Sequence, residues 1–291
     1  MTAAPAAPDL AVNPGVWMTG WPADRAPAVV DRLAAIGYRR VVVVLRDPHG
    51  FEVEPVRALL QGAGLRAVAN SNQVAGEDVA SDDPAVRSRG VARLRRAIAL
   101  ARDLGADQLT GVTYGVLGKA GGPVSDAAFE RTARLLGDLA DEAAESGVRL
   151  LCEVVNRYET AMLTTARRGM EFADLSGSPH LGLHLDVFHM NIEEDDMVAA
   201  VAEAMPRLAY LELEQNHRGE LRAGHLRLAD FLDGVLHAGY RGRFGLEAFT
   251  ARALDPDHAA GLAVWRDVLD PGTRIAEDAY ALVRDALARR G

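Results

Sequence analysis

The feature that most constrains this chain is a regular alternation of strand-like and helix-like segments along almost its whole length. Short runs of strand-forming apolar residues, such as 40–45 and 181–187, alternate with longer amphipathic segments, such as 83–104. Neither a linker nor a change in composition interrupts the series. Eight such runs predict an α/β protein, a closed (β/α)8 barrel with one parallel strand and one helix per repeat.

The prediction is a single TIM barrel over residues 14–291, preceded by an Ala/Pro-rich, disordered N-terminal arm at 1–13. The predicted strands are 15–19, 40–45, 65–68, 108–112, 150–155, 181–187, 208–214 and 244–248. The predicted helices are 24–36, 54–63, 83–104, 125–146, 161–173, 194–205, 227–238 and 273–289. A doubly wound open sheet is the alternative. It would need a glycine-rich phosphate loop after the first strand, and Gly15 and Gly20 are too isolated to form one.

The composition excludes several classes of function. The 291 residues carry a net charge of −9 and no basic block, so nucleic acid is a poor partner. The only cysteine, Cys152, cannot form a disulfide within the chain, which fits the reducing cytoplasm. No segment has the pattern of a signal peptide or a membrane span. We therefore expect a cytoplasmic protein that binds neither nucleic acid nor membranes.

Carboxylates occur at the ends of four consecutive predicted strands, each in apolar surroundings. They are Glu153, Asp186, Glu212 with Glu214, and Glu247. Side chains at the C-terminal ends of barrel strands converge on one site. Two carboxylates about 4 Å apart repel by several kcal/mol at an intermediate dielectric, so such a group needs a cation. Carboxylate ligands favour a hard divalent ion such as Mn²⁺ or Mg²⁺ over Zn²⁺.

Further polar residues stand at or beyond the predicted strand ends. His184 alternates in phase with Asp186 and should point into the barrel, where we interpret it as a hydrogen-bonded core residue. His189 and Arg218 lie in polar loops, where substrate binding is a more common role than packing. The loops expected to decide specificity carry Trp17, Trp21, Asn70, Asn72, Tyr114 and Lys119, with Tyr114 as a substrate contact.

Four sequence motifs in the second half of the chain resemble those of the ketose 3-epimerases, the D-tagatose and D-allulose 3-epimerases. The motifs are Glu153-Val-Val-Asn-Arg-Tyr-Glu159, Leu185-Asp-Val-Phe-His-Met-Asn-Ile-Glu-Glu194, Asn216-His-Arg-Gly219 with Gly224-His225, and Gly245-Leu-Glu-Ala-Phe249. That group belongs to the xylose-isomerase-like, sugar phosphate isomerase/epimerase superfamily of TIM barrels. The motifs cover about half the chain, and their combination and order make the resemblance specific.

The resemblance implies a role for each matching residue. Glu153, Asp186 and Glu247 would bind the metal, and Glu153 and Glu247 would also be the catalytic acid/base pair. Glu159, His189 and Arg218 would bind sugar oxygens. The remaining ligand of the family is a histidine on the seventh strand, and the matching position here is Glu212. Glu212 would complete a site of four carboxylates. There are two alternatives: Glu214 or His184 is the fourth ligand in place of Glu212, or the protein binds no metal.

These residues predict a metal-dependent epimerase or isomerase that acts on a ketose through an enediolate. The expected cofactor is a divalent ion, Mn²⁺ in the first place, with Mg²⁺ and Co²⁺ as alternatives. The expected partner is a small carbohydrate, which we expect to be a free sugar because no glycine-rich phosphate cradle is present; a homo-oligomer is left open. Two other readings remain: a metal-dependent dehydratase or lyase acting on a keto-sugar or glycoside, and a non-catalytic barrel subunit.

Overall fold

The computed structural model describes residues 7–269 and 274–290, which form one closed barrel of parallel strands. The strands hydrogen-bond in the order β1-β8-β7-β6-β5-β4-β3-β2, and β1 packs beside β2 to complete the ring. The strands are β1 Leu10–Val12, β2 Arg40–Val44, β3 Arg66–Asn70, β4 Gln108–Thr110, β5 Arg149–Val154, β6 Gly182–Asp186, β7 Leu208–Leu213 and β8 Arg243–Leu246. The predicted TIM barrel is therefore confirmed.

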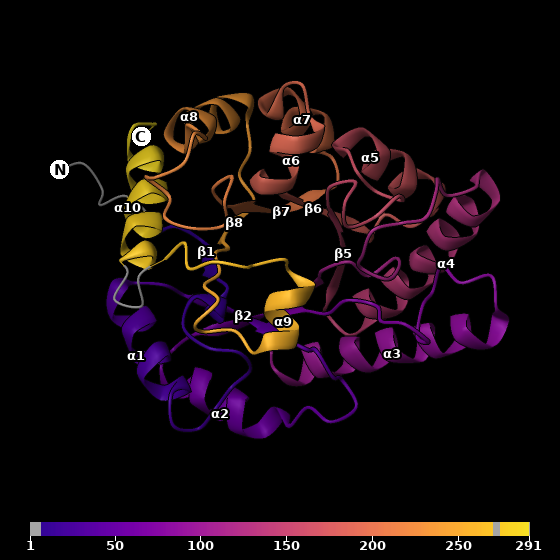
Figure 1. Cartoon of the computed structure of the whole chain (residues 1–291), viewed down its shortest axis with the longest axis horizontal. Helices are drawn as coiled ribbons and strands as arrows, with labels where there is room; N and C mark the ends of the chain where they lie inside the picture. Colours follow the sequence, from indigo (N-terminus) through magenta and orange to yellow (C-terminus); the bar gives the residue numbers. More distant parts are fainter. Residues whose placement is uncertain (1–6, 270–273, 291) are drawn as a thin grey trace.

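Helices surround the strands as an outer ring (Figure 1). They are α1 Ala26–Ile36, α2 Val53–Gly62, α3 Pro84–Asp103, α4 Asp126–Glu145, α5 Ala166–Leu175, α6 Val187–Glu193, α7 Met197–Ala204, α8 Leu228–Ala238, α9 Pro256–Gly261 and α10 Ile275–Ala288. The two short helices α6 and α9 are exceptions: α6 lies between α7 and the strands, and α9 lies inside the ring of helices, across the barrel opening. Within the described residues no helix is both long and apolar enough to span a membrane.

Helix α4 illustrates why the sequence forms this outer layer. The hydroxyl of Ser125 accepts a hydrogen bond from the backbone N–H of Ala128 and caps the helix. Phe129, Leu136 and Ala140 recur at helical spacing and are buried against the barrel. The strands beneath are buried on both faces, and every residue of β6 is buried.

The first strand lies earlier in the chain than predicted. Residues 15–19 do not form it: Leu10, Ala11 and Val12 do, in register with Phe244, Gly245 and Leu246 of β8. Residues 14–16 instead form a 3₁₀ helix, which the Asn13 side chain caps by accepting from the Gly15 N–H. The predicted arm at 1–13 is therefore wrong for residues 10–12, and its residues 1–6 lie outside the described part of the chain.

Two predicted helices have different bounds because of their N-caps. The helix predicted at 161–173 begins at Ala166, since Thr165 caps it by accepting from the Arg168 N–H. The helix predicted at 194–205 is preceded by the unpredicted α6, which follows β6 directly. Asp186 ends that strand and caps α6, and Asp196 caps α7. The last predicted helix, 273–289, is observed as α10, and residue 273 lies outside the described residues.

An ion-pair network closes the end of the barrel opposite the strand C-termini. Asp107, just before β4, contacts Arg40 and Arg66, each 3.1 Å away, and Arg243, 3.0 Å away. These arginines are the first residues of β2, β3 and β8. Burial raises the pKa of the Asp107 carboxyl, but the three guanidinium groups outweigh that effect and hold its pKa below the ordinary value.

Candidate metal and active site

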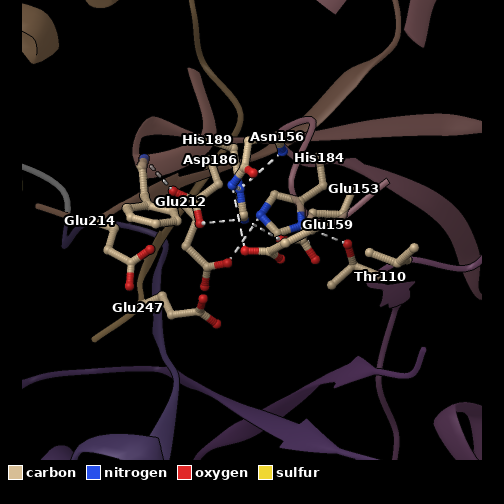
Figure 2. Close-up of polar contacts among 12 residues, drawn as sticks. Thr110, Glu153, Asn156, Glu159, His184, Asp186, His189, Glu212, Glu214 and Glu247 are labelled. Carbon is tan, nitrogen blue, oxygen red and sulfur yellow. Dashed lines mark hydrogen bonds and ion pairs between the residues drawn. The ribbon is translucent and has the colours of Figure 1, made fainter. Parts of the chain in front are cut away.

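Four carboxylates from neighbouring strands meet at the C-terminal end of the barrel (Figure 2). Glu153 comes from β5, Asp186 from the end of β6, Glu212 from β7, and Glu247 follows β8 directly. Side chains alternate along a strand, and the register pairs Asp186 with Glu212, so both point into the barrel. All four are buried, and the most exposed are Glu153 and Glu247 at 8%.

The carboxylates lie close enough for a shared cation. Three overlapping groups bring their ligand atoms within 4.8 Å of one another: Glu153, Asp186 and His189; Glu153, His184 and Glu212; and Asp186, Glu212 and Glu247. One oxygen of Asp186, Oδ1, accepts a hydrogen bond from the backbone N–H of Phe188. The other, Oδ2, is buried without a hydrogen-bond partner in the described residues. A buried carboxylate oxygen of this kind fits a metal ligand.

Electrostatics lead to the same conclusion. Burial raises the pKa of Glu153, Asp186 and Glu212 well above their ordinary values, and the neighbouring carboxylates raise them further. The electrostatic interaction with His184 has the opposite effect and lowers the pKa of Glu153. These groups therefore bind protons readily unless a cation lies among them. Carboxylate oxygens with an imidazole nearby are a donor set that suits a divalent metal ion.

Arg218 is the cation that contacts this cluster most closely. Its guanidinium contacts Glu247 directly and lies 3.6 Å from Glu159 and 3.0 Å from Glu214. The rings of Phe188 and Phe249 lie 4.4 and 4.9 Å from its Cζ. Its φ of 59° lies in the left-handed region, which a non-glycine residue adopts only when its surroundings hold it there.

His189 and Glu159 reach the site from beyond the strand ends: His189 lies on the short helix α6 and not in a loop as predicted, and Glu159 lies after β5. The Nδ1 atom of His189 accepts hydrogen bonds from the Asn156 backbone N–H, at 3.2 Å, and from the Asn156 side chain, at 2.7 Å. Its Nε2 must then carry the proton, because an acceptor Nδ1 in a neutral ring leaves the hydrogen on the other nitrogen. That Nε2 lies 3.9 Å from Glu153 Oε1 and 4.0 Å from Asp186 Oδ2.

A cavity of about 60 Å³ lies above the carboxylates. Its lining includes five of the residues proposed from the sequence, namely Glu153, Glu159, His189, Arg218 and Glu247. Asn70 and Asn72, expected in specificity loops, also line it, whereas Trp17, Trp21 and Lys119 do not. Asp186 and Glu212 lie beneath it. His258 of α9 and the adjacent Leu262 form its roof.

Tyr114 lies away from the position expected of a substrate contact. It is fully buried, its hydroxyl donates to the backbone carbonyl of Glu153 at 2.8 Å, and its ring packs against Phe172. The reason is local: β4 ends at Thr110, and Gly111 with a φ of 114° turns the chain, so the strand alternation does not continue to Tyr114. Tyr114 therefore packs in the core and stabilises β5 through the Glu153 carbonyl, and it does not line the cavity.

Three residues near the site were not assigned to it from the sequence. Asn13 donates to Glu247 Oε1 at 2.8 Å, and Tyr210 donates to Glu212 Oε1 at 3.1 Å. His258 contributes to the roof. Of these three, only Tyr210 could have been found from the sequence. It lies two residues before Glu212 on β7, so its side chain points to the same face of the strand.

The fold and site define the class of protein: the chain is a xylose isomerase-like TIM barrel, and residues 30–268 match the model of that family. Within this class it belongs to the ketose 3-epimerases, a family of enzymes. It is 36% identical to the L-ribulose 3-epimerase of Methylomonas sp. (strain DH-1) over 269 residues, which cover 92% of this chain and 94% of the relative. It is 33% identical to the ketose 3-epimerase of Arthrobacter globiformis, with 94% of each chain covered.

Solved structures agree with this assignment. An L-ribulose 3-epimerase structure superposes with a TM-score of 0.91 at 29% identity, covering 97% of this chain and 96% of the other. The D-allulose 3-epimerase from Methylomonas sp. in complex with D-allulose gives a TM-score of 0.88 at 34% identity, with 99% of each chain covered. The family suggested by the four motifs is thereby confirmed.

Proposed function

We propose that this enzyme inverts the configuration at C3 of a free ketose, with Glu153 and Glu247 as its two acid/base residues. The observation that carries the proposal is that these two carboxylates, from β5 and β8, line one small cavity above Asp186 and Glu212. Inversion through a planar enediolate needs one group to remove a proton and another to return it from the opposite face.

The residues that would hold a divalent ion are Glu153, Asp186, Glu212 and Glu247. We propose Mn²⁺, with Mg²⁺ and Co²⁺ as alternatives, since carboxylate oxygens dominate the ligands. When bound, such an ion would polarise the ketose carbonyl and make the neighbouring C–H more acidic.

The remaining residues position the sugar and manage the charge. One of Glu153 and Glu247 takes the C3 proton, and the other delivers a proton to the opposite face. Arg218 contacts both Glu247 and Glu159. It holds Glu247 in place as an acid/base residue, and it orients Glu159 toward a sugar hydroxyl. His189, with its proton on Nε2, donates a hydrogen bond to a sugar oxygen. General acid/base transfer of this kind contributes about 10²–10⁴-fold.

The charge of the cavity supports an unphosphorylated substrate. Glu153, Glu159 and Glu247 line it, and Arg218 is its one arginine among the described residues. A phosphate group brought there would face carboxylates on several sides. Relatives of this chain are an L-ribulose 3-epimerase, a ketose 3-epimerase and, at 28% identity, the D-psicose 3-epimerase of Agrobacterium fabrum (strain C58), and we propose a free ketose of that class as the substrate of this chain.

The test is turnover of free ketoses in D₂O, followed by proton NMR. The purified enzyme, loaded with Mn²⁺, is incubated with L-ribulose, D-fructose, D-tagatose and D-allulose and with a ketose phosphate. We expect the C3 epimer with deuterium at C3 from at least one free ketose, and none from the phosphate. An unsaturated product would establish the lyase alternative, and absence of both turnover and metal binding would establish the non-catalytic one.

Two further properties belong to the same proposal. The buried, unpaired Cys152 supports a cytoplasmic location. Tyr158 and Trp265 are large side chains that are 60% and 73% exposed, and they line one groove beside the site. Their exposure supports a homo-oligomer, which light scattering of the purified protein would test.

A further inference from the structure

His184 lies directly among the proposed metal ligands, although the sequence favoured a core role for it. It is fully buried on β6, with its ring against that of Tyr210 at a centroid distance of 4.6 Å. Its Nδ1 lies 2.9 Å from Thr110 Oγ1. Its Nε2 lies 3.1 Å from Glu212 Oε2 but in a direction that gives no hydrogen bond, and it has no hydrogen-bond partner in the described part of the chain.

The two inward histidines differ in the proton that their surroundings allow. At His189, backbone and side-chain donors of Asn156 occupy Nδ1, so Nε2 carries hydrogen and has no lone pair for a metal. At His184, Nδ1 hydrogen-bonds to a hydroxyl, which can accept as well as donate, and the Glu153 carboxylate, an acceptor only, lies 3.7 Å from the same nitrogen. His184 can therefore keep its hydrogen on Nδ1, donate it to Thr110, and leave Nε2 as a free electron pair.

The neighbouring groups are arranged to receive a cation at that electron pair. An unprotonated Nε2 and the carboxylate oxygen of Glu212, both electron-rich, lie side by side in a buried space. Tyr210 holds the other oxygen of Glu212, which leaves Oε2 on the His184 side. Gly245 of β8 makes room for this contact, since a Cβ there would lie 2.1 Å from the Tyr210 hydroxyl.

We propose that His184 is a nitrogen ligand of the metal centre, binding through Nε2 the same ion that Glu153 and Glu212 bind. This inference rests on the proposed function, and it changes the donor set from carboxylates alone to carboxylates with one imidazole. Thr110 then has the role that hydrogen-bond acceptors commonly have behind a ligating histidine: it fixes the tautomer and the direction of the ring. A nitrogen ligand favours Co²⁺ and Mn²⁺ over Mg²⁺.

Pulsed electron paramagnetic resonance of the Mn²⁺-loaded protein tests this directly, because it detects a nitrogen-14 nucleus bonded to the ion. We expect an imidazole nitrogen coupling in the wild-type protein, its loss in His184→Gln, and its persistence in the matched control His189→Gln. In parallel, His184→Gln should bind Co²⁺ at least about 10-fold more weakly, with a smaller loss for Mg²⁺. Circular dichroism establishes that each variant is folded.

Each outcome separates this inference from the proposed function. Mn²⁺ bound without nitrogen coupling, or with coupling that survives in folded His184→Gln, would overturn the role of His184 and leave the epimerase proposal intact. Failure of the wild-type protein to bind any divalent ion would overturn both. If His184→Gln does not fold, the double variant His189→Gln/His258→Gln decides: coupling that persists there assigns His184, and coupling that disappears there refutes the assignment.

Discussion

Glu214 accepts a hydrogen bond from the Nε of Arg218 at 3.0 Å, and both side chains are buried. The bond fixes one edge of the guanidinium, so that its terminal nitrogens face Glu247 and Glu159. Burial lowers the pKa of the Arg218 guanidinium, but the surrounding carboxylates raise it by more, and the group stays charged. Glu214 thus orients Arg218 without facing the cavity itself.

Removing the charge of Glu214 should weaken both stability and catalysis. We expect Glu214→Gln to lower the free energy of unfolding by about 1–3 kcal/mol, because a buried charged hydrogen bond is lost. We also expect kcat to fall about 10-fold, since Arg218 is less firmly held. Glu142→Gln, which removes an exposed ion pair with Arg95, is the control and should cost under about 1 kcal/mol. Urea unfolding and steady-state kinetics measure these effects, and equal behaviour of the two variants would contradict the role of Glu214.

Exchange of the C3 hydrogen with D₂O should identify Glu153 and Glu247 as the acid/base pair. We expect Glu153→Gln and Glu247→Gln each to lower epimer formation by about 10²–10⁴-fold, because inversion needs both groups. Each variant should still exchange the C3 hydrogen of one epimer with D₂O, since the remaining carboxylate reaches one face. Glu203→Gln, at an exposed ion pair with Arg167, should behave as wild type. Unchanged epimerisation in either Gln variant would remove that residue from the mechanism.

Metal binding should stabilise the fold. The ion would bind buried carboxylates that exist as a cluster only in the folded state. A free metal concentration of 100 times Kd should therefore raise the free energy of unfolding by about 2.7 kcal/mol. For a protein of this size that corresponds to a rise in Tm of roughly 4–5 °C. Differential scanning fluorimetry with EDTA, Mn²⁺ and Co²⁺ measures the shift. Asp186→Asn should show a much smaller one, and a full shift in that variant would argue against Asp186 as a ligand.

The network at the opposite end of the barrel predicts a dependence of stability on pH. Three arginines hold the pKa of Asp107 below its ordinary value of 3.8 in the folded protein, so the unfolded state binds this proton more tightly. Its contribution is complete above about pH 5, roughly one unit above the unfolded pKa, and is lost as the pH falls through the lowered folded pKa. We expect Asp107→Asn to cost about 1–3 kcal/mol at pH 7, with the difference shrinking below about pH 5. A constant difference from pH 7 to pH 3 would contradict this.

Much of the fold and the family was predictable because the signals are local. An isolated carboxylate inside an apolar run, as at Glu153 and Glu247, marks both a strand and a site. What could not be predicted depends on distant partners. The strand at Leu10–Val12 is only three residues long and is defined by β8, more than two hundred residues away. Nothing in the sequence beside His184 indicates that Thr110 and Glu212 flank its ring nitrogens.

The roof formed by α9 has a consequence for the timing of the reaction. The space of about 60 Å³ between the roof and the carboxylates is smaller than the roughly 300–1,000 Å³ of pockets that hold small molecules. The roof is fastened by Asp255, which pairs with Arg46 after β2 and is hydrogen-bonded to Thr19. We therefore expect this contact to release when sugar enters and product leaves, and the roof to limit the access of bulk solvent to the reacting carbon in between. We expect turnover to depend on this opening step as well as on proton transfer, so that raising the solvent viscosity lowers kcat.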